Sequence, residues 1–363
     1  MKPLLIATVL FGLLVTMSPL TAQQGGAGGG QSAQPGRAGG PGGGQPAQPG
    51  RAAGPGRGGQ AAQPGGGAAT WTPKRINKAI ELLEIGQPVY YAQVDGGGYE
   101  DGRRMASTQA DYITYNLEHS SFDMTQLREF MRGLVDGGPT KSGHRTPAVI
   151  VVTPAVGWDQ EQMRANQWMM QHIMASGVHG MLLPHAVDPT AVKLMIEAIR
   201  YPFAPVAPGL AQGRQGNGSQ GYAARIWGIS ANEYLRKADP WPLNPNGEFL
   251  IGLKIETIVG AQNAETLVRV PGVGFAEWGP GDQAFNVGHI LGLGAPAPAN
   301  HPMLREIRTR VFAAAKAAKV FFLNACSGQD VVSLLDEGVM ICTGGGTAAS
   351  TIGRQHTKRQ MPW

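Results

Sequence analysis

Eight short apolar runs alternate with amphipathic stretches along the chain, and this regular alternation most constrains the fold. The spacing predicts strands over residues 88–94, 111–117, 147–153, 178–183, 249–255, 273–277, 320–323 and 339–342. Helices are expected over residues 75–85, 124–135, 158–175, 188–200, 261–268, 301–316 and 330–337. Alternating strands and helices favour a parallel sheet, and eight units favour closure into a single TIM (β/α)8 barrel.

An open, doubly wound sheet is the alternative architecture. Its dinucleotide-binding form needs a Gly-x-Gly-x-x-Gly turn between the first strand and a helix. In this chain the first strand runs into Asp95 and three consecutive glycines, Gly96 to Gly98, and no helix is evident after them. This arrangement counts against a dinucleotide fold. The segment from Tyr201 to Asn246 is rich in Gly, Gln and Pro and is expected to interrupt the alternation.

The first 22 residues have the pattern of an export signal. Lys2 supplies a positive start, Leu4 to Val15 is a short apolar run, and small residues up to Ala22 offer a cleavage site. The alternative is an uncleaved membrane anchor, but a helix needs about 20 apolar residues to cross a bilayer. We therefore expect a signal peptide over residues 1–22 and an exported protein, periplasmic or extracellular, with no stable membrane span after cleavage.

Residues 23–70 repeat the theme Ala-Gln-Pro-Gly-Arg and hold much of the chain's 54 Gly and 27 Pro. The segment lacks apolar side chains to bury, so a disordered low-complexity linker is predicted. Residues 1–70 also contain four basic residues and no acidic one, and so carry +4 of the net charge of +5. Residues 71–363, which should form the barrel, are nearly neutral, and no nucleic-acid partner is indicated.

The chain has two cysteines, Cys326 and Cys342. Two cysteines cannot build a disulfide framework or a zinc site. An oxidising compartment would permit one disulfide if the two lie close together. We nevertheless interpret them as a pair of inert core thiols.

Polar residues follow most of the predicted strands, where the chemistry of a TIM barrel is located. They are Asp95, Glu118, His119, Thr153, His185, Glu256, Asp282 and Asn324. Glu256 and Asp282 follow successive strands, which lie under about 5 Å apart in a sheet, so both carboxylates can reach one cation. Hard carboxylate ligands suit Mg²⁺ or Mn²⁺. The alternative is that these are ordinary solvated strand ends and that Glu256 pairs with Lys254.

The motifs around these residues resemble those of the HpcH/HpaI aldolase family, the metal-dependent pyruvate aldolases related to the citrate lyase β subunit. The most specific motifs are Lys254-Ile255-Glu256-Thr257, Val270-Pro271-Gly272-Val273 and Gly279-Pro280-Gly281-Asp282. They are similar to the family's Gln-Ile-Glu-Thr, Val-Pro-Gly-Val and Gly-Pro-Ala-Asp. Shorter pieces in the family's order are Leu117-Glu118-His119, Leu183-Pro184-His185, Arg200-Tyr201-Pro202 and His301-Pro302. The resemblance runs from about Arg75 to Ser350.

The resemblance implies that Glu256 and Asp282 hold a divalent metal, Mg²⁺, Mn²⁺ or Co²⁺, which would stabilise the enolate of a pyruvate-like acid. Backbone N–H groups of the turn from Gly279 to Asp282, which contains Pro280 and Gly281, would bind the substrate carboxylate, with glycine permitting the close approach. His119 would be the catalytic base acting on the hydroxyl of a 4-hydroxy-2-oxo acid. The alternative for His119 is that it caps the following helix.

Four positions depart from the family pattern. Thr153 falls where the family has an Arg that contacts the substrate's keto group, and Ala175 where it has the Asp that partners the catalytic His. Lys254 replaces a Gln, and Gly346 replaces an Asp. Lys254 and Glu256 share one strand face. Lys254 therefore either supplies the positive charge that Thr153 lacks, as a catalytic residue, or only neutralises Glu256.

Three functions are consistent with these features. The first is a carbon–carbon lyase, an aldehyde-lyase of the class II pyruvate aldolase type, cleaving or forming a small 4-hydroxy-2-oxo acid. The second is an exported protein on the same scaffold that binds a small oxo acid without catalysis. The third is recognition of a phosphorylated substrate by the loop from Gly344 to Gly346, because loops after the last barrel strands often bind phosphate. The expected partners are a small-molecule oxo acid and further copies of the chain in a homo-oligomer.

The export signal generates a first prediction. Mass spectrometry of the native protein should find a mature N-terminus near Gln23, because cleavage is expected after Ala22. Recovery of an intact form that begins at Met1 from the cytoplasm would contradict it.

Overall fold

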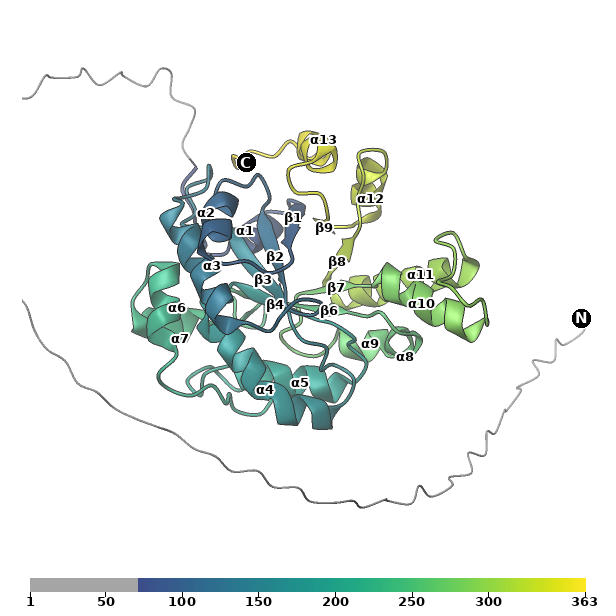
Figure 1. Cartoon of the computed structure of the whole chain (residues 1–363), viewed down its shortest axis with the longest axis horizontal. Coiled ribbons are helices and arrows are strands. Elements are labelled where there is room, and N and C mark those ends of the chain that lie inside the picture. The colour runs from purple at the N-terminus through teal and green to yellow at the C-terminus, as the bar shows by residue number, and fades with distance from the viewer. Residues whose placement is uncertain (1–70) are drawn as a thin grey trace, which may run out of the picture. The chain divides into compact units, whose positions relative to one another are not determined.

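The computed structural model describes residues 71–363, and its strands form a closed parallel barrel (Figure 1). The strands are β1 (Val89–Val94), β2 (Tyr112–Asn116), β3 (Ala148–Val152), β4 (Gly180–Leu183), β5 (Pro240–Trp241), β6 (Phe249–Lys254), β7 (Phe275–Glu277), β8 (Phe321–Asn324) and β9 (Ile341–Cys342). All of them except β5 close the ring. In it β4 pairs with β6 and β9 pairs with β1. The predicted TIM barrel is confirmed, and the predicted signal peptide (1–22) and linker (23–70) lie outside the described residues.

Helices surround the barrel and follow each of its eight strands (Figure 1). They are α1 (Lys78–Glu84), α2 (Tyr99–Met105), α3 (Met124–Asp136), α4 (Gln160–Ala175), α5 (Pro189–Ile199), α6 (Gln220–Trp227), α7 (Ala231–Lys237), α8 (Ile258–Gln262), α9 (Ala264–Leu267), α10 (Pro280–Ile290), α11 (Pro302–Ala318), α12 (Val331–Glu337) and α13 (Ala348–His356). None of the helices between Trp71 and Trp363 combines the length and the apolar character that crossing a membrane requires.

Some helices were not expected from the sequence. A short helix, α2, does follow the glycines after β1, and it begins where the Asp101 carboxylate accepts the backbone N–H of Gly98. The segment from Tyr201 to Asn246 contains α6 and α7 as well as β5, and α10 begins within the motif after β7. These helices are short or rich in glycine, so their apolar periodicity is weak, and packing against the barrel decides their formation.

The strands separate two apolar cores. Inward-facing side chains such as Ile150, Leu250 and Phe275 pack with Ile80 and Leu83 of α1. Outward-facing side chains pack against the surrounding helices. The side chain of Asn77, which caps α1, donates to the carbonyls of His179 and Glu248, just before β4 and β6. Helix α1 therefore closes the N-terminal end of the barrel and leaves the C-terminal end open for a site.

The two cysteines form a disulfide, so the interpretation of inert core thiols is wrong. Cys342 ends β9, and Cys326 lies two residues beyond the end of the neighbouring strand β8. Their Cα atoms are 5.4 Å apart, within the range that a disulfide spans. Pairing of Asn324 with Cys342 in the sheet brings the two cysteines together, and sequence separation alone does not reveal this.

A buried ion cluster ties the C-terminal segment to the barrel. Asp111, just before β2, contacts Lys78 Nζ at 3.2 Å, Arg354 Nη2 at 3.2 Å and Arg359 Nη1 at 2.7 Å. The side chains of Asp111, Arg354 and Arg359 are fully buried. Burial acts to raise the pKa of Asp111, but the three cations outweigh it and the pKa is lowered. One carboxylate thus holds α1, α13 and the C-terminal residues together.

We expect Asp111→Asn to lower the free energy of unfolding by about 3–5 kcal/mol, because it leaves three cations buried without a counter-charge. Urea denaturation followed by circular dichroism measures this change. Asp336→Asn is the matched control: Asp336 pairs with His356 at the surface with its side chain 63% exposed, so a loss below about 1 kcal/mol is expected. Equal losses of unfolding free energy in the two variants would show that the buried cluster stabilises the fold no more than a surface ion pair does.

Candidate active site

A cavity of about 270 Å³ lies at the open, C-terminal end of the barrel. Its lining combines residues of six barrel strands, β1 to β4, β6 and β7, with two residues that follow β2. The lining residues are Tyr91, Gln93, Thr114, Asn116, Glu118, His119, Val152, Leu182, Lys254 and Glu277. Two of the sequence-predicted site residues, His119 and Lys254, are in this set.

Lys254 links two carboxylates at the mouth of the barrel. Its ammonium lies 2.7 Å from Glu118 Oε2 and 3.1 Å from Glu256 Oε2. Burial acts to lower the pKa of Lys254, but the charges of Glu256 and Glu118 outweigh it, so the pKa is raised and the side chain is a stable cation. The neutralising contact with Glu256 that the sequence allowed is therefore present, and Glu118 is a second partner.

Glu118 is placed by a turn at the end of β2. Asn116 Oδ1 accepts the backbone N–H groups of Glu118 and His119. This turn points Glu118 into the barrel mouth, with its side chain only 4% exposed, and leaves His119 at the rim, with its side chain 66% exposed. His119 Nε2 lies 3.5 Å from Glu118 Oε2. Helix α3 is capped by Asp123, so the alternative role of His119 as a helix cap is excluded.

His185 lies between the two carboxylates. Its Nε2 is 3.7 Å from Glu118 Oε1, and its Nδ1 is 3.7 Å from Glu256 Oε1. The imidazole stacks on Trp158 with ring centroids 4.6 Å apart. Burial lowers the pKa of His185, although Glu118 and Asp282 act in the opposite direction, so the neutral imidazole is favoured.

Glu256 and the first turn of α10 are held against each other. Gln283 donates to the carbonyls of Ile255 and Thr257 on either side of Glu256. Gly279 has a φ of 55°, and a Cβ at this position would overlap the side chain of Glu256, so the residue must be glycine. Asp282 lies in this first turn of α10, and its charge acts on His185. The fold therefore brings both predicted metal ligands to the same part of the barrel mouth.

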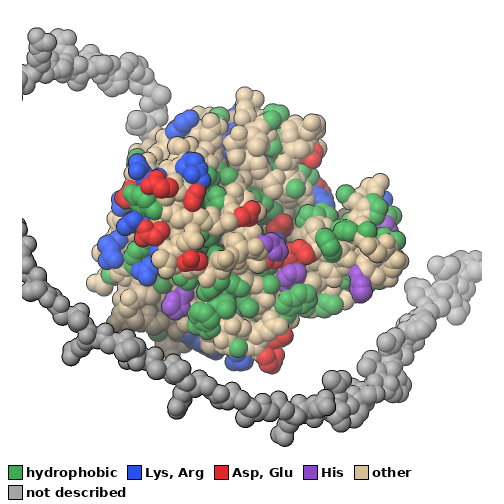
Figure 2. All heavy atoms as spheres, viewed as in Figure 1, with side chains coloured by type: hydrophobic (Ala, Val, Ile, Leu, Met, Phe, Trp, Pro, Cys, Tyr) green, Lys and Arg blue, Asp and Glu red, His purple; other side chains and the backbone are tan. Residues whose placement is uncertain are grey.

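Three buried polar atoms in this cluster have no hydrogen-bond partner among residues 71–363. They are Glu118 Oε1, His185 Nδ1 and Glu256 Oε2, of which the last lies 3.1 Å from the Lys254 ammonium as an ion pair. A buried polar atom without a hydrogen bond is costly, so these atoms are suited to hold an added ligand. Glu118, His185 and Glu256 each offer one ligand atom within 4.8 Å of the others, a grouping that could hold a metal ion. Figure 2 shows acidic and histidine side chains gathered near the centre of the face in view.

Two carboxyl groups in the mouth have raised pKa values. Burial raises the pKa of Glu256 to about 8, against the lowering effects of Lys254 and of the His185 N–H. Burial likewise raises the pKa of Glu277, at the end of β7, to about 7. With Asp282 and Glu118 nearby, the site holds more acidic than basic groups and favours an added cation.

The remaining predicted positions fall in different places. Thr153 is fully buried and its hydroxyl donates to the Pro154 carbonyl, so it lies outside the cavity lining and its contact with substrate stays a prediction. Pro280 and Gly281 open α10, where the first N–H groups of a helix lack intrahelical partners. Ala175 ends α4 and lines a separate hollow with Gln171. Matching Ala175 to a site residue is therefore wrong, because helices of a barrel return toward the N-terminal ends of the strands.

The glycine loop after β9 has little capacity left for phosphate. The N–H of Gly345 donates to the Tyr91 carbonyl, the N–H of Gly346 to Ser350 Oγ, and the N–H of Thr347 to the Gly344 carbonyl. Backbone groups that already donate within the protein cannot also hold an anion. The structure thus offers no support for a phosphorylated substrate at this loop.

Glu277 and the role of Glu118 were missed from the sequence. Both are single acidic residues at strand ends. The sequence signal that could have identified Glu277 is its position on a strand beside the strand of Lys254, since these two residues pair in the sheet.

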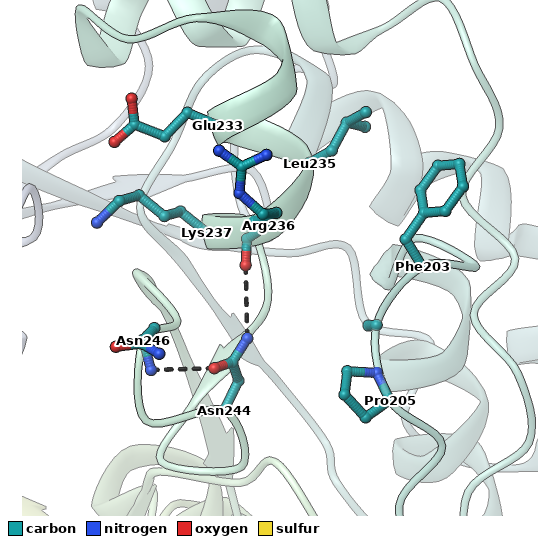
Figure 3. Close-up of a pocket in the computed structure, with 9 residues that line it drawn as sticks. Phe203, Pro205, Glu233, Leu235, Arg236, Lys237, Asn244 and Asn246 are labelled. Carbon is teal, nitrogen blue, oxygen red and sulfur yellow. Dashed lines mark hydrogen bonds between the residues drawn. The ribbon is translucent and has the colours of Figure 1, made fainter.

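A larger hollow of about 450 Å³ lies elsewhere, between α7 and the segment from Phe203 to Pro205, with Arg236 and Lys237 beside it (Figure 3). None of the predicted site residues lines that hollow.

Comparisons with known proteins address the fold and, in part, the chemistry. No family model matches the chain. A hydroxypyruvate/pyruvate aldolase of Deinococcus radiodurans is 26% identical over 210 residues, which cover 58% of this chain and 63% of that protein. The match thus spans less than two thirds of that relative's length.

Two solved structures share the barrel. An HpcH/HpaI aldolase/citrate lyase family protein from Burkholderia cenocepacia has a TM-score of 0.58 and 19% identity, covering 78% of this chain and 97% of that one. An HpcH/HpaI aldolase from Desulfitobacterium hafniense has a TM-score of 0.55 and 18% identity, covering 77% and 95%. The resemblance indicated by the motifs is therefore confirmed: the chain has the fold of the HpcH/HpaI aldolase/citrate lyase family and is similar in sequence to a hydroxypyruvate/pyruvate aldolase.

Proposed function

We propose that the protein is a carbon–carbon lyase that cleaves or forms a small 4-hydroxy-2-oxo acid with the help of a divalent metal. The observation that carries this proposal is the group of buried, unpartnered acceptor atoms at the open end of the barrel. The similarity to a hydroxypyruvate/pyruvate aldolase supports the same reaction class. The proposed location remains outside the cytoplasm, and the proposed assembly remains a homo-oligomer.

The residues at the barrel mouth fit a divalent cation. Glu256 Oε2 makes no hydrogen bond in the described chain and forms an ion pair with the Lys254 ammonium, and Asp282 lies in the helix turn packed against Glu256. We assign these two carboxylates as metal ligands, with Mg²⁺, Mn²⁺ or Co²⁺ as the ion. When bound, the ion supplies a Lewis acid for the keto oxygen of a pyruvate-like acid and lowers the energy of its enolate.

The first turn of α10 is the proposed site for the substrate carboxylate. Gly279 sits at the N-cap, and Pro280 and Gly281 begin the helix, so the positive end of the helix dipole faces the barrel mouth beside Glu256. No Cβ at Gly281 would meet another atom within 4 Å, so the backbone there is open to a ligand. These groups would orient a 2-oxo acid through its carboxylate.

His119 is the proposed base for the 4-hydroxyl group. It lines the cavity, its ring is largely exposed, and Glu118 at 3.5 Å would stabilise the imidazolium formed when it takes a proton. Lys254, held by Glu118 and Glu256, adds a fixed positive charge to the cavity wall. Such a charge would favour a developing enolate, which is the catalytic role proposed for Lys254.

The alternative function is binding of an oxo acid without turnover. The specific observation in its favour is that the described cavity lining contains no arginine, and Lys254 cannot reproduce the bidentate fork of a guanidinium. The assay described next separates the two functions. A binding protein would bind the metal and the acid but would neither exchange the methyl protons of pyruvate nor cleave a carbon–carbon bond.

The purified full-length chain with Mn²⁺ should exchange the methyl protons of pyruvate in deuterium oxide and should cleave one or more 4-hydroxy-2-oxo acids. Nuclear magnetic resonance follows both reactions. Glu256→Gln and Asp282→Asn should lose both activities together with tight Mn²⁺ binding. His119→Asn should keep metal binding and proton exchange but cleave about 10²–10⁴-fold more slowly. Binding of Mn²⁺ and pyruvate with neither reaction would reject the lyase and favour the binding protein.

Metal binding should also depend on pH through Glu256. Since the pKa of this group is raised to about 8 in the metal-free protein, the carboxyl carries a proton near neutrality that a metal must displace. Mn²⁺ affinity should therefore rise with pH up to about 8, by up to about tenfold per pH unit, and then level off. Titration calorimetry in two buffers of different ionisation enthalpy counts the protons released. Unchanged affinity between pH 6 and pH 8 would contradict this prediction.

A further inference from the structure

We propose that His185 and Glu118 join Glu256 and Asp282 as ligands of the divalent ion, and that the nitrogen donor of His185 shifts the preference of the site from Mg²⁺ toward Co²⁺ and Zn²⁺. The inference rests on the proposed function in one respect, since it takes a cation at Glu256 as given. It adds a ligand that the sequence motifs did not assign and a class of metal that follows from it.

The spacing of the three side chains suits one ion. Ligand atoms of Glu118, His185 and Glu256 lie within 4.8 Å of one another. His185 Nε2 lies 3.7 Å from Glu118 Oε1 and Nδ1 lies 3.7 Å from Glu256 Oε1, and one of these nitrogens would bind the ion while the ring faces both carboxylates. Ligands about 2.0–2.2 Å from one ion are separated by roughly 3–3.6 Å. Only a small adjustment of the side chains would complete such a site.

Each of the three residues presents a buried atom that lacks a hydrogen-bond partner in the described chain, and that of Glu256 has an ion-pair contact with the Lys254 ammonium at 3.1 Å. Glu118 Oε1, His185 Nδ1 and Glu256 Oε2 have no hydrogen-bond partner. The side chains of Glu118 and Glu256 are 4% and 0% exposed, so solvent does not readily supply the missing contacts. A cation between them accounts for all three atoms at once.

The backbone and ring of His185 are fixed in place before any ligand arrives. Its φ is 47°, in the left-handed region that non-glycine residues seldom occupy. Its N–H donates to Glu256 Oε1 at 2.7 Å, the next N–H donates to the Lys254 carbonyl, and its ring stacks on Trp158. An unfavourable backbone conformation held by several contacts is typical of functional positions.

Lys254 leaves room for the ion rather than replacing it. Its ammonium contacts Oε2 of Glu118, whereas Oε1 of that carboxylate faces His185. Glu277 and Asp282 add two further carboxyl groups, so carboxyl groups outnumber cations at the mouth with Lys254 in place. The lysine therefore neutralises one side of the cluster and the proposed ion the other.

The types of ligand atom determine which metal ion the site prefers. Mg²⁺ takes oxygen ligands almost exclusively and keeps much of its water shell. An imidazole nitrogen is a good ligand for Zn²⁺ and other first-row transition ions, which also accept carboxylates. A histidine among the carboxylate ligands therefore favours Co²⁺ or Zn²⁺ over Mg²⁺.

Electron spin echo measurements on Mn²⁺ bound to the full-length chain test this directly, because they detect an imidazole nitrogen coordinated to the ion. The signal is expected in the wild type and in His119→Asn, the matched control for a second histidine at the same carboxylate. It should vanish in His185→Asn. Asparagine tolerates the left-handed conformation, so this variant should fold, which its circular dichroism spectrum and thermal melting check. Competition calorimetry should show the preference for Co²⁺ over Mg²⁺ falling on the order of tenfold or more in His185→Asn alone.

Three results would overturn the inference. Bound Mn²⁺ without a nitrogen signal in the wild type would reject His185 as a ligand and leave the metal-dependent lyase intact. A nitrogen signal that is lost in His119→Asn and kept in His185→Asn would show that His119, not His185, coordinates the ion. Failure of the wild type to bind Mn²⁺, Co²⁺ or Zn²⁺ at all would reject both the inference and the metal dependence of the proposed function.

Discussion

The pairing of β4 with β6 closes the barrel, and the arrangement of the site depends on it. The two strands are separated by the long segment that contains α6, α7 and β5, yet Gly180 lies opposite Leu250 and the register continues to Leu183 and Leu253. Because the strands are parallel and in this register, the residues just beyond them meet. The N–H of Ala186 reaches the Lys254 carbonyl and that of His185 reaches the Glu256 carboxylate. Any change in this pairing would separate the two halves of the mouth.

At the barrel mouth, burial affects the pKa values of Glu256 and Glu277 more than ion pairs do. Burial alone would keep Glu256 and Glu277 protonated at neutral pH, and Lys254 only partly offsets this effect. The result is a set of carboxyl groups whose ionisation depends on what else is bound. This differs from the cluster at Asp111, where three cations surround one acid and lower its pKa. The first arrangement responds to ligands, and the second is fixed and structural.

The sequence predicted the barrel well because each of its strands is an apolar run with a clear end. It also brought Glu256, Asp282, Lys254 and His119 to the correct end of the barrel, since strand ends converge in any parallel barrel. It did not predict α2 or α10, whose glycines weaken the helical pattern and whose stability comes from packing. Nor could it predict that Glu118 and His185 meet Glu256, because this contact depends on strand register and on one left-handed backbone conformation.

The disulfide between Cys326 and Cys342 has a consequence for where the chain can mature. It encloses α12 in a loop with a sequence separation of 16 residues, and closing a loop of about this length stabilises a protein by about 3 kcal/mol in the chain-entropy description. Glutathione in a reducing cytosol would keep the two cysteines reduced and so remove that contribution to stability. The same loop follows Asn324, whose side chain accepts hydrogen bonds from Trp278 and Arg308 beside the barrel mouth. Protein with reduced cysteines would therefore have a looser edge between β8 and β9 than protein in which the disulfide has formed.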